Sequence, residues 1–156
     1  MESGKKIAIG ADHGGYHLKG LLSDFMRQAG YEVIDTGAFS SEPSDYPDYA
    51  RLVAGRVVSG DAWRGVLICG SGVGASVAAN KFRGIRAAVC HDTYSARQGV
   101  EDDAMNILCL GARVVGEELA KEIVGAFLRA EFKDLERYRR RLSKIEEIEK
   151  RWMTSS

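Results

Sequence analysis

Short apolar runs alternate with longer amphipathic segments along the chain, and this alternation limits the possible folds more than any other feature. Five runs have the length and composition of buried strands, at residues 6–10, 32–37, 65–69, 85–90 and 107–110. Helical spacing predicts helices over residues 16–29, 48–59, 74–82, 116–130 and 135–152, with a short helix between the last two strands. Strands separated by helices predict an α/β protein with a five-stranded parallel sheet covered on both faces. The pattern leaves the strand order open.

The chain has the size of one domain, and its charges balance. It has 156 residues without an internal repeat, a low-complexity stretch or an interdomain linker, so we expect one domain over residues 1–156. Lys and Arg number 22, as do Asp and Glu, so no overall field attracts the chain to nucleic acid or a membrane. Any anion that it binds must therefore be held by a local group of side chains.

The cysteines and the apolar runs indicate a compartment. Cys69, Cys90 and Cys109 form no CxxC pair, and each lies in or at the end of an apolar run, as reduced cysteines of a cytosolic protein do. No apolar run approaches the roughly 20 residues that cross a bilayer. The first residues resemble no signal peptide. We therefore expect a cytoplasmic protein.

The most informative motif is the glycine-rich segment ICGSGVGAS, at residues 68–76, where the third strand turns into a helix. Gly70, Gly72 and Gly74 let the backbone approach a ligand closely, and the N–H groups at a helix start form an anion cradle. Cys69 stands at the edge of this cradle, where N–H groups favour a thiolate, which is a competent proton acceptor. Ser71 could hydrogen-bond an oxyanion beside it.

Two other interpretations of this segment remain open. It is compatible with a tight turn that carries an incidental buried cysteine. It also fits the dinucleotide fingerprint G-x-G-x-x-G/A through Gly70, Gly72 and Ala75, with Asp92 placed about 20 residues further on. A chain of this length has no room for a separate substrate domain, which argues against a nucleotide-dependent enzyme, although a nucleotide-binding module stays an alternative.

A second polar constellation follows the first strand, in the segment GADHGGYHLK. Asp12 and His13 lie after a strand and before a helix, where Asp12 could bind sugar hydroxyls and His13 a phosphate or ring oxygen. Asp12 could instead be a helix N-cap. His13 and His17 have the i,i+4 spacing of metal ligands, but the chain has three histidines and no acidic cluster near these two. We therefore expect no metal site.

The last predicted helix has two faces of different character. Its apolar residues recur at steps of three and four and form one stripe beside a basic cluster. A terminal helix of this kind docks on another surface, such as a second subunit, or presents a solvated charged face, and both interpretations stay open. Four arginines in a chain without net charge are a poor basis for nucleic-acid binding. The stripe contains Leu135, Tyr138, Leu142, Ile145, Ile148 and Trp152, and the cluster Arg137, Arg139, Arg140 and Arg141.

These motifs together resemble the ribose-5-phosphate isomerase B family, which includes galactose- and allose-phosphate isomerases. The matching segments are GADHGGYHLK, DYPDYA at 45–50, ICGSGVGASVAANKFRGIRAAVC at 68–90, LGARVVGEELAKEIV at 110–124, and the helix with Arg137 and Arg141. The resemblance covers nearly the whole chain. It implies a Rossmann-like αβα sandwich, a homodimer or a tetramer, an active site shared by two subunits, and no metal or organic cofactor.

The resemblance also implies roles for individual residues. Cys69 corresponds to the base of the cysteine-type branch, which moves a proton between C1 and C2 of a phosphorylated sugar, while Ser71 and the backbone N–H groups of residues 70–74 stabilise the enediolate. The residues expected to line the sugar are Asp12, His13 and Tyr46. The residues expected to hold the phosphate are Arg113 and, from the neighbouring subunit, Arg137 and Arg141, whose i,i+4 spacing places them on one helical face.

Three positions depart from the family pattern. Asp102 stands where the family has a histidine thought to open the furanose ring, Asp103 where it has an asparagine, and Tyr138 where it has a histidine. The first replacement bears on which sugar the chain accepts. The expected activity is aldose–ketose isomerisation of ribose 5-phosphate, and the alternatives are erythrose 4-phosphate, galactose 6-phosphate and allose 6-phosphate.

Overall fold

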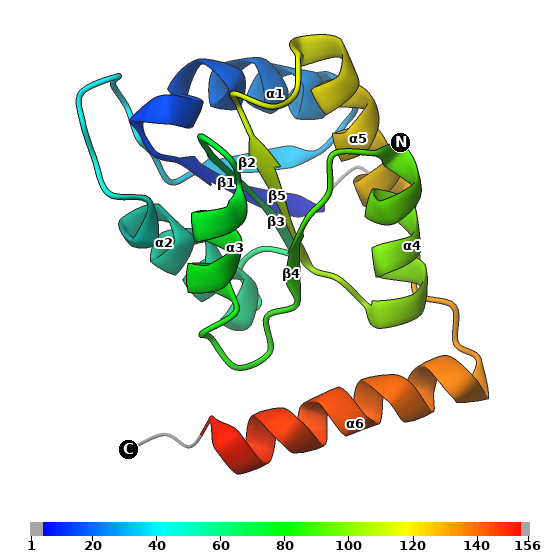
Figure 1. The fold of residues 1–156 in the computed structure, drawn as a ribbon. Helices are drawn as coiled ribbons and strands as arrows, with labels where there is room; N and C mark the ends of the chain where they lie inside the picture. The colour runs from blue at the N-terminus through cyan, green and yellow to red at the C-terminus, as the bar shows by residue number, and fades with distance from the viewer. Residues whose placement is uncertain (1–4, 154–156) are drawn as a thin grey trace.

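A five-stranded parallel sheet lies between two layers of helices in the computed structural model, which describes residues 5–153 (Figure 1). The strands are β1 (Lys6–Ala11), β2 (Glu32–Asp35), β3 (Arg64–Cys69), β4 (Ala87–Val89) and β5 (Ile107–Gly111). The helices are the short 3-10 helix η1 (His13–Gly15), α1 (Tyr16–Gln28), α2 (Tyr46–Val58), α3 (Val73–Ala79), α4 (Thr93–Asp103), α5 (Glu117–Arg129) and α6 (Glu136–Trp152). The predicted α/β class and Rossmann-like sandwich are confirmed.

The strand order is β2-β1-β3-β5-β4, and every neighbouring pair is parallel. The chain therefore reverses its direction of travel across the sheet between β1 and β3, and β5 inserts between β3 and β4. In an open parallel sheet, ligands bind at the carboxyl ends of the strands near such a reversal. This places the ends of β1, β3 and β5 at the expected position of a site.

The element boundaries differ from the sequence prediction at two informative places. β2 ends at Asp35 rather than at Gly37, because Gly37 has a φ of 100° and turns the chain out of the sheet. The connection between β4 and β5 holds a full helix of 11 residues rather than a short one. The Asp92 carboxylate caps this helix by accepting a hydrogen bond from the Ser95 N–H at 2.6 Å, which stabilises its first turn.

Side-chain alternation along the strands sends neighbouring residues to opposite cores. In β3, Val66 and Ile68 pack into the core beneath α1, α4 and α5, while Leu67 and Cys69 pack into the core beneath α2 and α3. All four side chains are at most 5% exposed, as expected for a strand covered on both faces. Cys69 is thus directed toward the α3 side of the sheet by the period of its strand.

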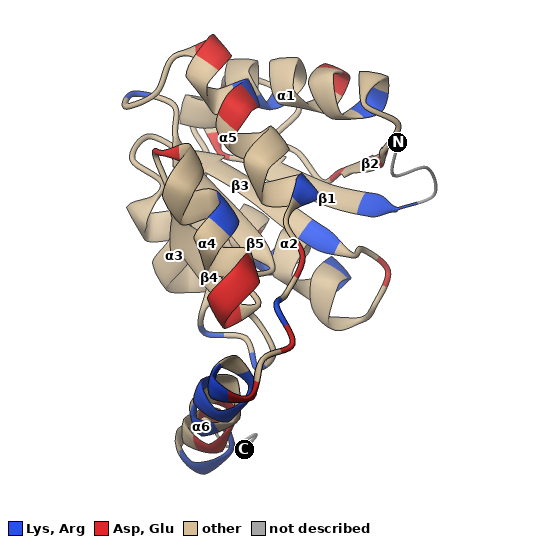
Figure 2. Cartoon of the chain, turned by 90° about the vertical axis from the view of Figure 1, so that its right-hand side faces the viewer, with Lys and Arg blue, Asp and Glu red and all other residues tan. Residues whose placement is uncertain are grey.

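Helix α6 lies apart from these layers, below the ends of α3 and α4 in the view of Figure 1, and the colouring of Figure 2 marks Lys and Arg positions along its ribbon. None of its residues is buried. Tyr138 and Leu142 of the predicted stripe are half-buried, but Ile148 is 61% and Trp152 73% exposed. Within residues 5–153, no helix combines the length and apolar character needed to cross a membrane.

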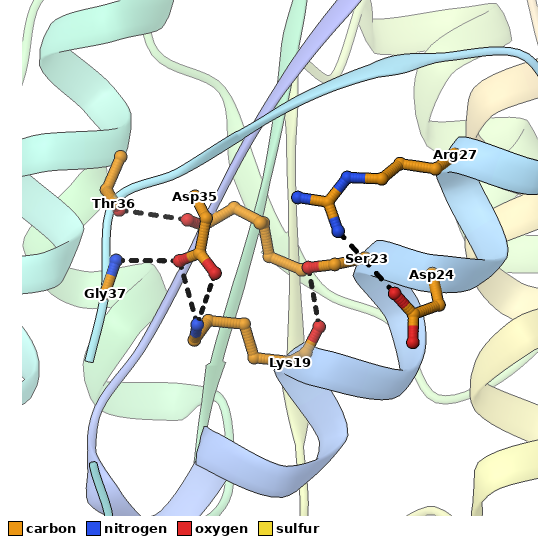
Figure 3. A network of polar contacts seen from close by, with 8 residues as sticks. Lys19, Ser23, Asp24, Arg27, Asp35, Thr36 and Gly37 are labelled. Carbon is orange, nitrogen blue, oxygen red and sulfur yellow. Dashed lines mark hydrogen bonds and ion pairs between the residues drawn. The ribbon is translucent and has the colours of Figure 1, made fainter. Parts of the chain in front are cut away.

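An ion pair fixes the start of α1 against the end of β2 (Figure 3). The Lys19 ammonium lies 2.7 and 2.8 Å from the two Asp35 oxygens, and the Gly37 N–H donates to the same carboxylate at 2.9 Å. The Lys19 side chain is 4% exposed and that of Asp35 is 27% exposed. Because Lys19 is buried, the Asp35 carboxylate takes the place of the water that would otherwise solvate the ammonium. The pair therefore joins α1, β2 and the loop that follows β2.

We expect Asp35→Ala to lower the free energy of unfolding by about 2–3 kcal/mol, somewhat less than the roughly 3–5 kcal/mol for breaking a fully buried pair. The matched control is Asp24→Ala, which breaks the exposed pair with Arg27 on the same helix and should cost less than about 1 kcal/mol. Urea unfolding of the three proteins measures both effects. Equal losses in the two variants would contradict the assigned role of Asp35.

Candidate active site

A pocket of about 410 Å³ opens at the carboxyl ends of β1, β3 and β5. It gathers seven of the residues that the sequence singled out, from segments far apart in the chain. Residues at the starts of η1, α2 and α3 line it, and the first turn of a helix has backbone N–H groups without a partner inside the helix. The sequence prediction missed Val114, which follows Arg113 and becomes identifiable only when β5 is known to lie beside β3. The lining residues are Asp12, Tyr46, Cys69, Gly70, Ser71, Gly74, Arg113 and Val114.

The glycine-rich turn is pressed against the end of β5. Gly72 has a φ of 81°, and a Cβ there would lie 2.9 Å from the carbonyl carbon of Leu110. A Cβ on Gly111 would in turn lie 2.7 Å from the backbone carbonyl of Ser71. The Arg113 N–H donates to the Gly70 carbonyl at 3.1 Å, which ties the following loop to the turn. Glycine is required at positions 72 and 111 because two backbones touch.

Cys69 is the cysteine whose surroundings suit acid–base chemistry. Its sulfur accepts a hydrogen bond from the Gly72 N–H at 3.2 Å, at the start of α3. Burial and the nearby Asp92 raise the pKa of Cys90 to about 11, and burial also raises the pKa of Cys109 well above its ordinary value. Both therefore remain thiols at neutral pH. Of the three cysteines, Cys69 alone lines the pocket.

Asp12 and His13 are held by the backbone at the mouth of the site. One oxygen of Asp12 accepts from the Gly14 N–H at 2.9 Å and so caps η1, while the residue also lines the pocket. The capping and ligand-binding interpretations are thus compatible. His13 is exposed, lies next to the lining residue Asp12 without lining the pocket itself, and binds Ser44 through its backbone N–H at 3.0 Å and its ring Nδ1 at about 3.1 Å. His13 therefore anchors the loop before α2.

The Tyr46 ring forms one wall of the pocket. It lies at the start of α2, and a Cβ on Gly74 would come within 2.6 Å of its ring, so the ring packs directly on the α3 backbone. Arg113 also lines the pocket, beside Gly70: its Cδ would lie 3.8 Å from a Cβ on that glycine. An exposed guanidinium thus stands beside a row of N–H groups, which is an arrangement suited to an anion.

The other four predicted site residues lie elsewhere in the same chain. Asp102 and Asp103 end α4, which runs back from the carboxyl edge of the sheet to its amino edge, where β5 begins. Partial desolvation and the Asp102 carboxylate raise the pKa of Asp103, and the charge of Arg141 opposes this rise. Arg137 lies one turn before Arg141 on α6, stacked on the Tyr138 ring at 4.6 Å. We call Asp102, Asp103, Arg137 and Arg141 the amino-edge cluster.

His91 and Asp92, which follow β4, both have structural partners. The ring Nε2 of His91 accepts a hydrogen bond from the Gly111 N–H at 2.9 Å, which supports the end of β5. The Asp92 carboxylate, which the dinucleotide fingerprint would direct at a ribose, instead caps α4. Among the described residues, no group of three or more His, Cys, Asp or Glu side chains is arranged to hold a metal ion.

Comparison with known proteins identifies relatives along nearly the whole chain. Residues 7–145 match the family model described as Ribose/Galactose Isomerase. Ribose-5-phosphate isomerase B of Escherichia coli is 50% identical over 94% of this chain and 98% of its own length. D-erythrulose-4-phosphate isomerase of Pectobacterium atrosepticum is 47% identical over 81% of this chain and 84% of its own. The solved ribose-5-phosphate isomerase B of Clostridium thermocellum superposes with a TM-score of 0.92 at 53% identity, covering 94% of this chain and 99% of that one.

We expect Gly72→Ala to destabilise the protein more than Gly60→Ala. Both glycines have a φ of 81°, so alanine costs roughly 1–2 kcal/mol at either position for the left-handed conformation. At position 60 the new Cβ meets nothing within 4 Å, whereas at position 72 it meets the Leu110 backbone. Denaturant unfolding of the two variants isolates the contact. Equal destabilisation would show that the turn can move away from β5.

Proposed function

Because this chain belongs to the ribose/galactose isomerase family, we propose that its pocket interconverts ribose 5-phosphate and ribulose 5-phosphate with Cys69 as the base. The enzyme is an aldose–ketose isomerase of a sugar phosphate. The observation that carries the assignment of the base is the Cys69 sulfur, which lines the pocket and accepts the Gly72 N–H. Cys90 and Cys109 have raised pKa values and lie outside the lining.

In the proposed mechanism the Cys69 thiolate removes the proton from C2 of the open-chain aldose. The electron pair of that bond forms the C1–C2 double bond, and the C1 carbonyl oxygen becomes the enediolate oxygen. The backbone N–H groups of the 70–74 turn and the Ser71 hydroxyl stabilise this negative charge. The Cys69 thiol returns the proton to C1, the C2 hydroxyl becomes the ketone, and its proton passes to the C1 oxygen. No cofactor is consumed.

We propose that the phosphate is held by arginines of two subunits. Arg113 lines the pocket of its own chain, but Arg137 and Arg141 lie at the amino edge of the sheet. A homodimer, or a tetramer built from such dimers, brings the amino-edge cluster of one chain to the pocket of its partner. The exposed apolar residues of α6 supply a surface for that contact, Ile148 and Trp152 being 61% and 73% exposed.

A tetrose phosphate is the second candidate substrate. Two relatives are D-erythrulose-4-phosphate isomerases, from Pectobacterium atrosepticum and Mycolicibacterium smegmatis, and they are 47% and 41% identical to this chain. Asp102 favours such a substrate, because it stands in place of the histidine that would open a furanose ring. A tetrose 4-phosphate needs no ring opening, since its O4 carries the phosphate.

We also propose that the enzyme works in the cytoplasm. Its three cysteines are all free thiols and buried. Reduced thiols persist in the reducing cytosol, and Cys69 must stay reduced to act as a base.

Cys69→Ala should lower kcat for ribose 5-phosphate by at least about 100-fold, because it removes the proton acceptor. The matched control is Cys90→Ala, which shortens another buried cysteine and should keep kcat near that of the unchanged enzyme. Unfolding midpoints of both variants verify that the fold is retained. Turnover of Cys69→Ala close to that of Cys90→Ala would remove Cys69 from the mechanism.

Mixing Cys69→Ala with Arg141→Ala protein should restore activity that neither variant has alone. Each mixed dimer then keeps one site with an intact Cys69 and an intact Arg141 from opposite chains. Activity is measured after subunit exchange, which mass spectrometry of differently tagged chains verifies. Complete exchange without recovered activity would contradict the shared site.

Asp102→His should raise kcat/KM for ribose 5-phosphate more than for erythrose 4-phosphate. Histidine has an unperturbed pKa of about 6.5 and can donate a proton to the furanose oxygen near neutral pH. The competing explanation is that His13 or His91 opens the ring, and the ring nitrogens His13 Nδ1 and His91 Nε2 are already bound to backbone groups. Both substrates are assayed with both proteins. An unchanged ratio of the two kcat/KM values would make Asp102 a bystander.

A further inference from the structure

Arg86, immediately before β4, joins its own turn to the end of α4 near the amino edge of the sheet. Its Nε donates to the Ala104 carbonyl at 2.7 Å, and its Nη1 lies 3.3 Å from the Gly84 carbonyl. Ala104 ends α4 in the left-handed conformation, with a φ of 53°, directly after Asp102 and Asp103. The Arg86 side chain therefore holds the end of the helix that carries both carboxylates.

Asn106 closes the same junction from the other side. Its side-chain oxygen accepts from the Arg86 N–H at 2.7 Å, and its side-chain nitrogen donates to the Gly84 carbonyl at 2.8 Å. The turn before β4 and the turn before β5 are thus joined by side-chain hydrogen bonds as well as by the sheet.

Helix α6 is attached to this junction near its carboxyl end. The Glu149 carboxylate accepts a hydrogen bond from the Gly84 N–H at 3.0 Å. Burial lowers the pKa of Arg86, and the charges of Glu146 and Glu149 oppose this, so the acidic side of α6 faces the guanidinium. A groove of about 380 Å³ separates α6 from the 83–86 turn around these contacts.

The amino end of α6 has a second attachment. The Lys133 N–H donates to the Glu101 carbonyl at 2.9 Å, and the Lys133 ammonium lies 3.5 Å from the Glu101 carboxylate. Arg137 and Arg141 lie between the two attachments. Glu149 is eight residues beyond Arg141, which is about 12 Å along the helix axis. Because no α6 residue is buried, the two attachments contribute much of what sets the position of the helix on its own chain.

We propose that Arg86, Asn106 and Glu149 form a latch that sets the position of Arg137 and Arg141 relative to Asp102 and Asp103. The latch residues are positioning residues: they act on substrate through the amino-edge cluster, which the proposed shared site delivers to the partner's pocket. The inference rests on that proposed function and extends it to residues outside the pocket and the amino-edge cluster.

The first test compares Glu149→Ala with Glu147→Ala, which removes an exposed glutamate two residues away on the same helix. We expect Glu149→Ala to raise KM for ribose 5-phosphate by about tenfold with a smaller change in kcat, because a displaced phosphate clamp weakens binding before it affects proton transfer. Glu149→Gln keeps an oxygen that can accept the Gly84 N–H, so it should rescue much of the loss. Glu147→Ala should leave KM unchanged.

The second test uses subunit exchange at substrate concentrations below KM. Glu149→Ala mixed with Cys69→Ala should recover activity, because each mixed dimer has one site with an intact cysteine and an intact latch. Glu149→Ala mixed with Arg141→Ala should recover none, because both lesions lie in the amino-edge half and every site receives one of them. Unfolding midpoints and dimer mass are measured for each variant, and Glu149→Gln replaces Glu149→Ala in both tests if the alanine variant does not form dimers.

The outcomes separate the latch from the shared site. If Cys69→Ala and Arg141→Ala complement each other while Glu149→Ala has the KM of Glu147→Ala, the latch is wrong and the shared site stands. If Glu149→Ala complements Arg141→Ala, Glu149 does not act through the amino-edge cluster. If Cys69→Ala and Arg141→Ala fail to complement after verified exchange, the shared site is wrong. The latch proposal is then overturned as well, because it depends on the shared site.

Discussion

The backbone contact between the 70–74 turn and the end of β5 is the constraint on which the site depends. Gly72 lies against Leu110, and Gly111 lies against Ser71, so neither strand end can move without the other. This contact places the Gly72 N–H against the Cys69 sulfur. It also brings Arg113, two residues after β5, beside the same turn. The proposed base Cys69 and the Arg113 guanidinium are therefore positioned by one packing contact between the neighbouring parallel strands β3 and β5.

The parts of the pocket that depend on local sequence patterns could be predicted from the sequence. Apolar runs located all five strands, and the rule that parallel sheets bind ligands at their carboxyl ends selected Asp12 and the segment from Cys69 to Gly74. The strand order β2-β1-β3-β5-β4 could not be predicted, because it depends on how helices of similar character pack over the sheet. Val114 was missed for that reason: its place in the pocket follows from β5 lying beside β3. Asp12 also shows that one side chain can cap a helix and line a site.

The separation of the pocket from the amino-edge cluster follows from the polarity of a parallel sheet. Every strand delivers its carboxyl end to one edge, so each connecting helix must return the chain to the other edge. Asp102 and Asp103 end the return helix α4 and precede β5. They therefore lie at the amino edge of the sheet, whereas Cys69 lies at the carboxyl edge. A site that needs both groups has to draw them from two chains. In a two-fold dimer the exchange is reciprocal, which gives two equivalent sites from one kind of contact.

The charges of the amino-edge cluster bear on how strongly such a site would hold phosphate. An asparagine at position 103 would offer both a donor and an acceptor, whereas the carboxylate of Asp103 is acceptor-only when ionised. The Asp103 carboxylate and the Arg141 guanidinium attract each other. The negative charge of Asp103 therefore offsets part of the electrostatic attraction between Arg141 and a phosphate. Partial desolvation and the Asp102 carboxylate raise the pKa of Asp103, and both effects favour its neutral form. Protonation would turn Asp103 into a hydrogen-bond donor and free Arg141 for the anion. Arg137, one turn earlier on α6, is stacked on the Tyr138 ring and is the second guanidinium of the cluster.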